Sequence, residues 1–157
     1  MTSEGVLGKP RPSGRGGVTA EFFVGGIPRP QGSKSVSRTG HLYESSKGLK
    51  TWRATVTMTA KAWRAKQWGS RSHALGLDGA PLEAALSFHL PQPKRTRFQR
   101  RPAGRPDLDK LCRAVFDGLT VAQIIVDDAR IVRLTATKEW APQAQAGCLV
   151  RLGVMES

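Results

Sequence analysis

Residues 82–90 (LEAALSFHL) carry the clearest alternation of apolar and other side chains in the sequence. Apolar residues occupy every second position from Leu82 to Leu90, and Glu83 and His89 are among those between them. Successive side chains of a β-strand point to opposite faces, so this pattern predicts a strand with one buried face. The rest of the chain should therefore supply a sheet around it.

Two amphipathic helices flank this strand in the sequence. Before it, apolar residues recur at three- and four-residue steps over 46–68, which predicts a helix that Ser45 or Ser46 caps. After it, the same spacing predicts a helix over 107–120. Both helices should place one apolar stripe against the sheet.

Further strands are predicted over 20–24, 131–138 and 148–154, and the polar stretch 28–48 reads as a long loop. The resulting order is β, α, β, α, β, β. This order indicates an α/β (α+β) fold, a single domain in which a small mixed sheet packs against two main helices on one or both faces.

The length of 157 residues fits one domain, which we expect over 19–157. Residues 1–18 are rich in glycine, proline, serine and positive charge, so they predict a disordered basic arm. The only two cysteines, Cys112 and Cys148, fall within a predicted helix and strand. We expect them to be buried, inert thiols.

The net charge of +13 points to a polyanionic partner, with nucleic acid first. A membrane is disfavoured because no apolar run approaches the roughly 18 to 20 residues of a spanning helix. The N-terminus lacks the pattern of a secretory signal, so we expect a cytoplasmic protein.

Five of the twelve carboxylates are clustered within 22 positions of this basic chain: Asp107, Asp109, Asp117, Asp127 and Asp128. Such a cluster would repel a polyphosphate backbone unless a hard divalent cation lay between them. Mg²⁺ uses a few carboxylates together with waters and phosphate oxygens, and needs no histidine or cysteine. The cluster therefore predicts a Mg²⁺ site, at which Mn²⁺ is an acceptable substitute.

Spacing selects three ligands from the five. Pro106 precedes Asp107, which is placed to cap the second helix, and Asp109 lies in the first turn of that helix. Counting strand parity backwards from residue 132 puts Asp128 on the core-facing side and Asp127 on the other. We therefore predict Asp107, Asp109 and Asp128 as metal ligands and keep Asp127 in reserve.

Each of these features also has an ordinary structural explanation. An aspartate before a helix is commonly a cap, Asp109 and Arg113 are spaced for a surface ion pair, and a double aspartate often marks a turn. The loop 94–105 has six positive charges and no carboxylate, which fits a solvated linker as well as a DNA contact. The coincidence of these features favours a metal-dependent nuclease.

The stretches RPDLDKLCRAVFDGL (105–119) and VDDARIVRLTATKEW (126–140) resemble the central signature of RusA-type Holliday junction resolvases. Weaker resemblance reaches back through GGIPRPQGS (25–33) and covers about 21–155. Two departures matter, since the family's usual Asn is Lys110 here and its helix Lys is Arg113. Arginine keeps the positive charge but does not readily lose a proton.

The resemblance implies a homodimeric nuclease, bacterial or phage-encoded, that nicks opposing strands of a four-way junction in DNA recombination and repair. It places Asp107, Asp109 and Asp128 at the family's essential carboxylates, and Arg113 as a catalytic cation that stabilises the phosphate. Lys138 matches a strand lysine, but a continuous strand would set it roughly 33 Å from Asp128, so we assign it to DNA contact.

Ten residues are expected to contact DNA: Lys34, Arg38, Lys94, Arg95, Arg97, Arg100, Arg101, Arg105, Lys110 and Lys138. Two alternatives stay open. One is a non-catalytic nucleic-acid-binding module, and the other is a nuclease for flap or single-stranded DNA, because nothing in the motif encodes four-way geometry.

Overall fold

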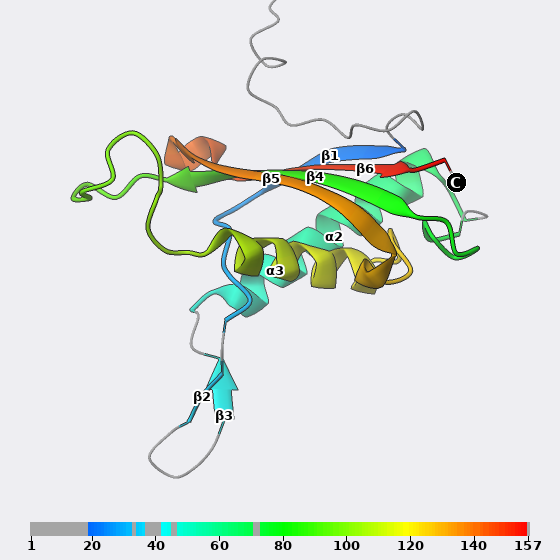
Figure 1. Ribbon diagram of the computed structural model, residues 1–157, viewed down its shortest axis with the longest axis horizontal. Coiled ribbons are helices and arrows are strands. Elements are labelled where there is room, and N and C mark those ends of the chain that lie inside the picture. The colour runs from blue at the N-terminus through cyan, green and yellow to red at the C-terminus, as the bar shows by residue number, and fades with distance from the viewer. Residues whose placement is uncertain (1–18, 33, 37–41, 45–46, 71–72, 157) are drawn as a thin grey trace, which may run out of the picture.

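A mixed four-stranded sheet forms the centre of the protein (Figure 1). The computed structural model describes residues 19–32, 34–36, 42–44, 47–70 and 73–156. The predicted arm 1–18 lies outside the described residues.

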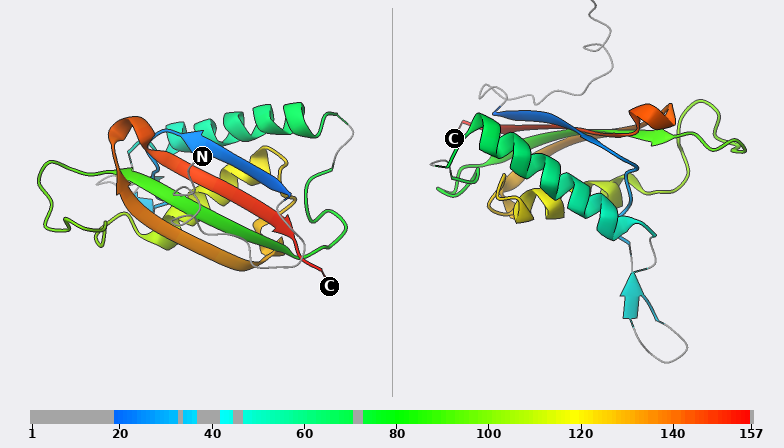
Figure 2. Two further views of the ribbon diagram at one scale, coloured as in Figure 1. Left: turned by 90° about the horizontal axis from the view of Figure 1, so that it is seen from above. Right: turned by 180° about the vertical axis from the view of Figure 1, so that it is seen from behind.

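The strand order in this sheet is β1-β6-β4-β5, with bounds Ala20–Gly25, Gly147–Val154, Leu82–Pro91 and Ile131–Ala141 respectively. Strand β4 pairs in parallel with β5 and antiparallel with β6, and β1 pairs antiparallel with β6. The strands predicted over 20–24, 131–138 and 148–154 and the mixed sheet are confirmed. Strand β5 forms one edge, as Figure 2 shows from above.

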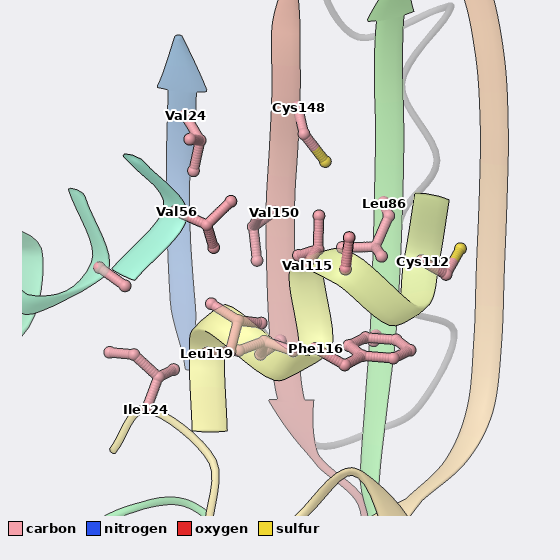
Figure 3. Close-up of a cluster of buried hydrophobic side chains, with 14 of the residues drawn as sticks. Val24, Val56, Leu86, Cys112, Val115, Phe116, Leu119, Ile124, Cys148 and Val150 are labelled. Carbon is pink, nitrogen blue, oxygen red and sulfur yellow. The ribbon is translucent and has the colours of Figure 1, made fainter. Parts of the chain in front are cut away.

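Helices α2 (Leu49–Gln67) and α3 (Leu108–Val121) both cover the same face of the sheet (Figures 1 and 2). Their apolar stripes and the inward side chains of the strands form one core, part of which is seen in Figure 3. The expected stripe of α2 is confirmed, since Leu49, Trp52 and Val56 are buried. The core thus fixes α3, and with it the aspartates at both of its ends.

Strand β4 differs from the prediction of one buried face. Ala85 is as buried as its inward neighbours, and the Glu83 carboxylate is 1% exposed, 3.5 Å from Arg133 Nη1. The physical reason is that β4 lies inside the sheet, where β5 and β6 flank it on both sides. The alternating pattern therefore predicted the face of β4 that packs against the helices, but it did not predict that the opposite face is also buried.

The start of α2 was also predicted wrongly. Gly48, in the left-handed conformation (φ 77°), is its N-cap, and no side chain of the described residues caps it. Ser45 and Ser46 lie outside the described residues. The predicted loop 28–48 contains a short antiparallel hairpin, β2 (Lys34–Val36) with β3 (Leu42–Glu44), which projects from the body of the protein (Figure 1).

Both cysteines are buried and free, as expected. Burial, with a smaller contribution from the charge of Asp109, raises the pKa of Cys112 to about 12. Burial also raises the pKa of Cys148 well above that of an ordinary thiol. In the described residues no helix is long and apolar enough to cross a membrane.

Candidate active site

The N-terminal end of α3 carries the first predicted pair of aspartates. Asp107 is the N-cap, as expected, but its side chain accepts no capping hydrogen bond. Its Oδ2 instead lies 3.6 Å from Nζ of Lys110, and both side chains are partly exposed. Asp109 follows in the first helical turn and is exposed. Because both carboxylates are exposed and Asp107 makes no capping hydrogen bond, both are accessible to a ligand.

The chain that leads into α3 is fixed to β5. Nζ of Lys138 donates to the carbonyl oxygens of Gly104 and Pro106 at 2.7 and 2.8 Å. Nε1 of Trp140 donates to the Phe98 carbonyl oxygen at 2.8 Å. Lys138 therefore positions the segment before Asp107, and its expected contact with DNA stays a prediction.

The second pair of aspartates lies at the other end of α3. Residues Asp128–Arg130 form a 3₁₀ turn that precedes β5, and Asp127 caps it by accepting from the Ala129 N–H at 2.9 Å. Strand parity therefore does not extend back to the pair, and the reason given above for choosing between them is wrong. Both aspartates line one pocket.

The two neighbouring carboxylates differ in acidity. A hydrogen bond between the side chains, burial and the charges of Asp127 and Asp117 raise the pKa of Asp128 above that of an ordinary aspartate. The bond from the Ala129 N–H, together with that same side-chain contact, lowers the pKa of Asp127. Asp128 therefore lies among negative charge that the protein compensates only partly.

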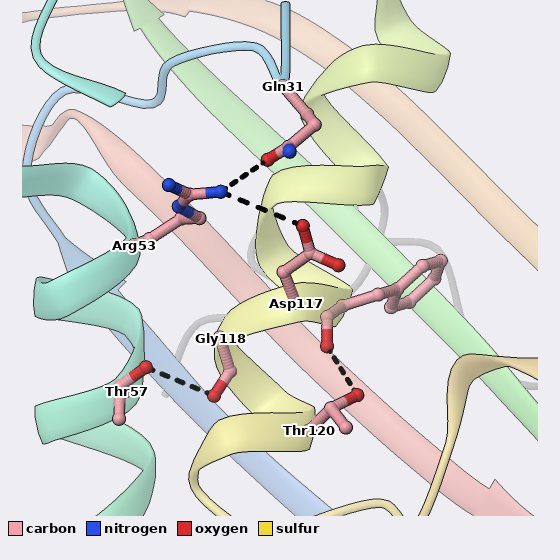
Figure 4. A network of polar contacts seen from close by, with 7 residues as sticks. Gln31, Arg53, Thr57, Asp117, Gly118 and Thr120 are labelled. Atoms are coloured by element: carbon pink, nitrogen blue, oxygen red, sulfur yellow. Dashed lines mark hydrogen bonds and ion pairs between the residues drawn. The ribbon is translucent and has the colours of Figure 1, made fainter. Parts of the chain in front are cut away.

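Asp117 belongs to this pocket and was not selected from the sequence. Its Oδ2 lies 3.9 Å from Nη1 of Arg53, which also donates to Oε1 of Gln31 at 3.0 Å (Figure 4). The signal was available, because Asp109, Arg113 and Asp117 are spaced by four residues and share one helix face. The hydroxyl-bearing Thr57 and Thr120 complete the lining beside Arg53.

The structure does not bring the three predicted ligands together within one chain. Asp109 and Asp117 are eight residues apart on α3, about 12 Å along its axis. Asp128 begins the 3₁₀ turn that follows the C-terminal end of α3 in the chain. Among the described residues no three aspartate, glutamate, histidine or cysteine side chains are grouped to hold a metal ion.

Arg113 lies between the two ends of α3 and is exposed. Within the described part of the chain, no ion pair joins it to Asp109, so the ordinary surface pair that their spacing allowed is not formed. Its guanidinium thus projects from the face that carries Asp109 and Asp117.

The basic loop 94–105 leaves the end of β4 and returns to α3. Five of its six cations are exposed and form no ion pair with another described residue: Lys94, Arg95, Arg97, Arg100 and Arg105. Arg101 is 3.9 Å from Glu139, and Arg97 stacks over the Phe98 ring at 4.8 Å. Lys34 belongs to β2, and Arg38 lies outside the described residues.

A search of curated proteins found no match. The family model described as "Endodeoxyribonuclease RusA" matches residues 26–151 of the 157, which include the basic loop and both ends of α3. The chain therefore belongs to the RusA family of endodeoxyribonucleases.

Proposed function

We propose that this protein is a Mg²⁺-dependent endonuclease that acts as a homodimer and nicks branched DNA in pairs, above all four-way junctions, during recombination and repair. The observation that carries the proposal is the placement of accessible carboxylates at both ends of one helix, beside an open edge of the sheet. Family membership supports the nuclease chemistry.

The carboxylates fit a hard cation. They offer oxygen donors only, and the crowding of Asp128 by Asp127 and Asp117 raises its pKa, a cost that a divalent cation would remove. Asp107, Asp109 and Asp128 are the proposed ligands. Bound Mg²⁺ would supply an activated water and stabilise the leaving 3′ oxygen.

A second copy of the chain can complete the ligand set. Strand β5 is an edge of the described sheet, and Val132 and Leu134 on it are 65% and 45% exposed. An edge strand with exposed apolar side chains is a template for pairing with another strand. A twofold axis would pair two β5 strands antiparallel, which is the usual symmetry of a homodimer.

The register of such a pair follows from the exposed side chains. If Val132 packs opposite Leu134 of the partner subunit, then the first residue of the partner's β5 lies opposite Thr135, and the turn that carries the partner subunit's Asp128 follows beyond it, toward Lys138 of this chain. Lys138 is bonded to the segment that leads into Asp107. Each site would therefore combine Asp107 and Asp109 of one subunit with Asp128 of the partner subunit, and one dimer would hold two such sites.

The cations of the chain have separate roles in this proposal. Arg113 projects from the helix face between the carboxylates, where it would stabilise charge on the phosphate without proton transfer. The basic loop 94–105 would bind the DNA backbone, largely without regard to base sequence. Selectivity would then rest on the shape of the branch.

Cleavage of a four-way junction, a flap and a linear duplex of equal length, with Mg²⁺, Mn²⁺ or EDTA, tests this function. Paired nicking of the junction that needs a divalent cation is the expected result. Binding to every substrate without cleavage would replace the proposal with a non-catalytic binding module. Cleavage of the flap alone would support a nuclease but contradict four-way junctions as its substrate.

A further inference from the structure

A second pocket lies at the N-terminal end of α3, with a volume of about 570 Å³. The segment that follows β1, the end of β4, the start of α3 and the end of β5 all contribute to it. Its polar and aromatic lining comprises Arg29, Arg105, Asp107, Lys110 and Trp140. None of the functions assigned above uses this pocket as a whole.

Rigid apolar groups make up much of the wall. Five prolines line it, and their rings fix the local backbone: Pro28, Pro30, Pro91, Pro93 and Pro106. Trp140 is held by its bond to Phe98, and Gln31 N donates to the Lys110 carbonyl oxygen at 2.9 Å, which ties the first segment to α3. The pocket is therefore formed before any ligand arrives.

Positive charge exceeds negative charge at this wall. Arg29, Arg105 and Lys110 line it with one carboxylate, that of Asp107, which lies 3.6 Å from Nζ of Lys110. Arg29 and Arg105 form no ion pair among the described residues. A ligand that suits this pocket has an anionic group for the arginines and a flat apolar part for Trp140 and the prolines.

We propose that this pocket takes one unstacked nucleotide of a DNA strand, with its phosphate at Arg29 and Arg105 and its base against Trp140. The proposal rests on the proposed function, which brings DNA to this end of α3. A pocket of this size accommodates a nucleotide, whereas a phosphate group alone would leave the aromatic and proline walls without a contact. Base stacking on an aromatic side chain tolerates any base.

The pocket supplies a physical reason for preferring branched DNA. Drawing a base out of a paired duplex costs a few kcal/mol, and the cost is least for a base that is already unpaired. Strand exchange points and discontinuities offer such bases, whereas a linear duplex does not. Because Asp107 lines this pocket, a captured nucleotide would place its neighbouring phosphate beside the carboxylates.

The test uses a duplex with one unpaired 5-iodo-deoxyuridine and a fully paired duplex of equal length, both bound to the full chain without divalent metal. We expect about fivefold tighter binding of the first DNA, which corresponds to the weaker end of base–aromatic stacking. Irradiation should crosslink the unpaired base to the peptide that contains Trp140, as mapped by mass spectrometry.

Arg29→Gln should reduce both the preference and the crosslink. Arg100→Gln is the matched control, because it removes the same charge from the exposed loop outside the pocket and should weaken both DNAs alike. Circular dichroism establishes that each variant is folded. A crosslink confined to another segment, or an equal loss of preference in both variants, would overturn the proposal.

Failure of this test leaves the proposed function standing if the wild-type chain still nicks junctions with Mg²⁺. If the chain shows no Mg²⁺-dependent nicking but crosslinks at Trp140, the proposed nuclease function fails and the nucleotide pocket stands. The pocket would then serve DNA binding alone.

Discussion

At the scale of single residues, neighbouring aspartates have different tasks. The Asp127 carboxylate accepts the Ala129 N–H and holds a turn, whereas Asp128 shares a hydrogen bond with it in a crowded acidic pocket. At the other end of α3, Asp107 occupies the N-cap position without making the capping bond. These local contacts decide which carboxylates are available to a metal.

Sequence reasoning identified the positions of the acidic pairs but could not assign their geometry. Composition was enough to pick out the cluster, because five carboxylates in a chain of net charge +13 require an explanation. The alternation of side chains along a strand could not predict where Asp127 and Asp128 point, because the strand begins only at Ile131, after a 3₁₀ turn. The spacing of Asp117 placed it on the same helix face as Asp109, but the sequence could not show that α2 brings Arg53 beside it.

Replacing Asp107, Asp109 or Asp128 with asparagine should lower cleavage by orders of magnitude, because each change removes a charged metal ligand while preserving size. DNA binding without divalent metal should stay the same or tighten, since repulsion from the backbone is removed. Nicking rates and binding isotherms on one junction measure both effects.

Asp78→Asn is the matched control, because Asp78 is exposed and its Oδ1 accepts a local bond from the Ala80 N–H, which asparagine retains. It should cleave as the unaltered chain does. Asp127→Asn is unsuitable as a control, since Asp127 lines the same pocket as Asp128. Near-normal nicking by Asp109→Asn and Asp128→Asn would remove them from the metal site.

At the scale of elements, the crossing of α2 and α3 depends on Gly118. A Cβ atom added there would lie 2.7 Å from Cγ1 of Val56 and 3.3 Å from the Arg53 carbonyl oxygen. The Thr57 hydroxyl also donates to the Gly118 carbonyl oxygen at 3.2 Å (Figure 4). This close approach brings Arg53 to Asp117 across the two helices.

Gly118→Ala should destabilise the protein by about 1–3 kcal/mol, because the methyl group forces the helices apart. At a solvent-exposed helix position the same change would stabilise the protein by about 1 kcal/mol. The sign of the change in the free energy of unfolding therefore shows whether Gly118 is needed for the helix contact. Adding Val56→Ala removes Cγ1, the nearest atom, but keeps Cβ at 2.9 Å, so the double variant should recover only part of the loss. Urea denaturation of the four proteins measures the coupling free energy.

Elements with periodic apolar side chains could be predicted, and those without could not. The stripe of α3 and the alternation of β6 follow from burial on one side, so their patterns survive in the sequence. The position of strand β5 was predicted correctly, but Val132 and Leu134 on it are exposed, because β5 lies at an edge of the described sheet. The hairpin β2–β3 has too few residues to show a period.

At the scale of the whole molecule, the charge is distributed so that cations surround the candidate site. The loop 94–105 projects from the end of the sheet where α3 begins, as Figure 1 shows, and most of its cations are exposed. Five of the twelve carboxylates lie on α3, at its N-cap or just beyond its C-terminal end. The exposed cations can therefore bind a DNA backbone close to the carboxylates that are proposed as metal ligands.

Binding to DNA should weaken steeply with salt, because exposed cations of the loop displace counterions from the backbone. Neutralising Arg100 and Arg101 to glutamine should reduce the slope of log affinity against log salt by about two. Fluorescence anisotropy of a labelled junction over a range of NaCl concentrations gives the slope. An unchanged slope would exclude the loop from the interface.

The central claim is that each active site combines Asp107 and Asp109 of one subunit with Asp128 of the partner subunit. Mixing two inactive variants, Asp107→Asn and Asp128→Asn, after joint unfolding and refolding tests it most directly. Heterodimers would contain one fully intact site and one doubly altered site, so junction cleavage should return as nicks in one strand. If each site were formed within a single chain, every site in the mixture would lack a ligand, and a mixture that stays as inactive as its parents, with heterodimers present, would contradict the claim.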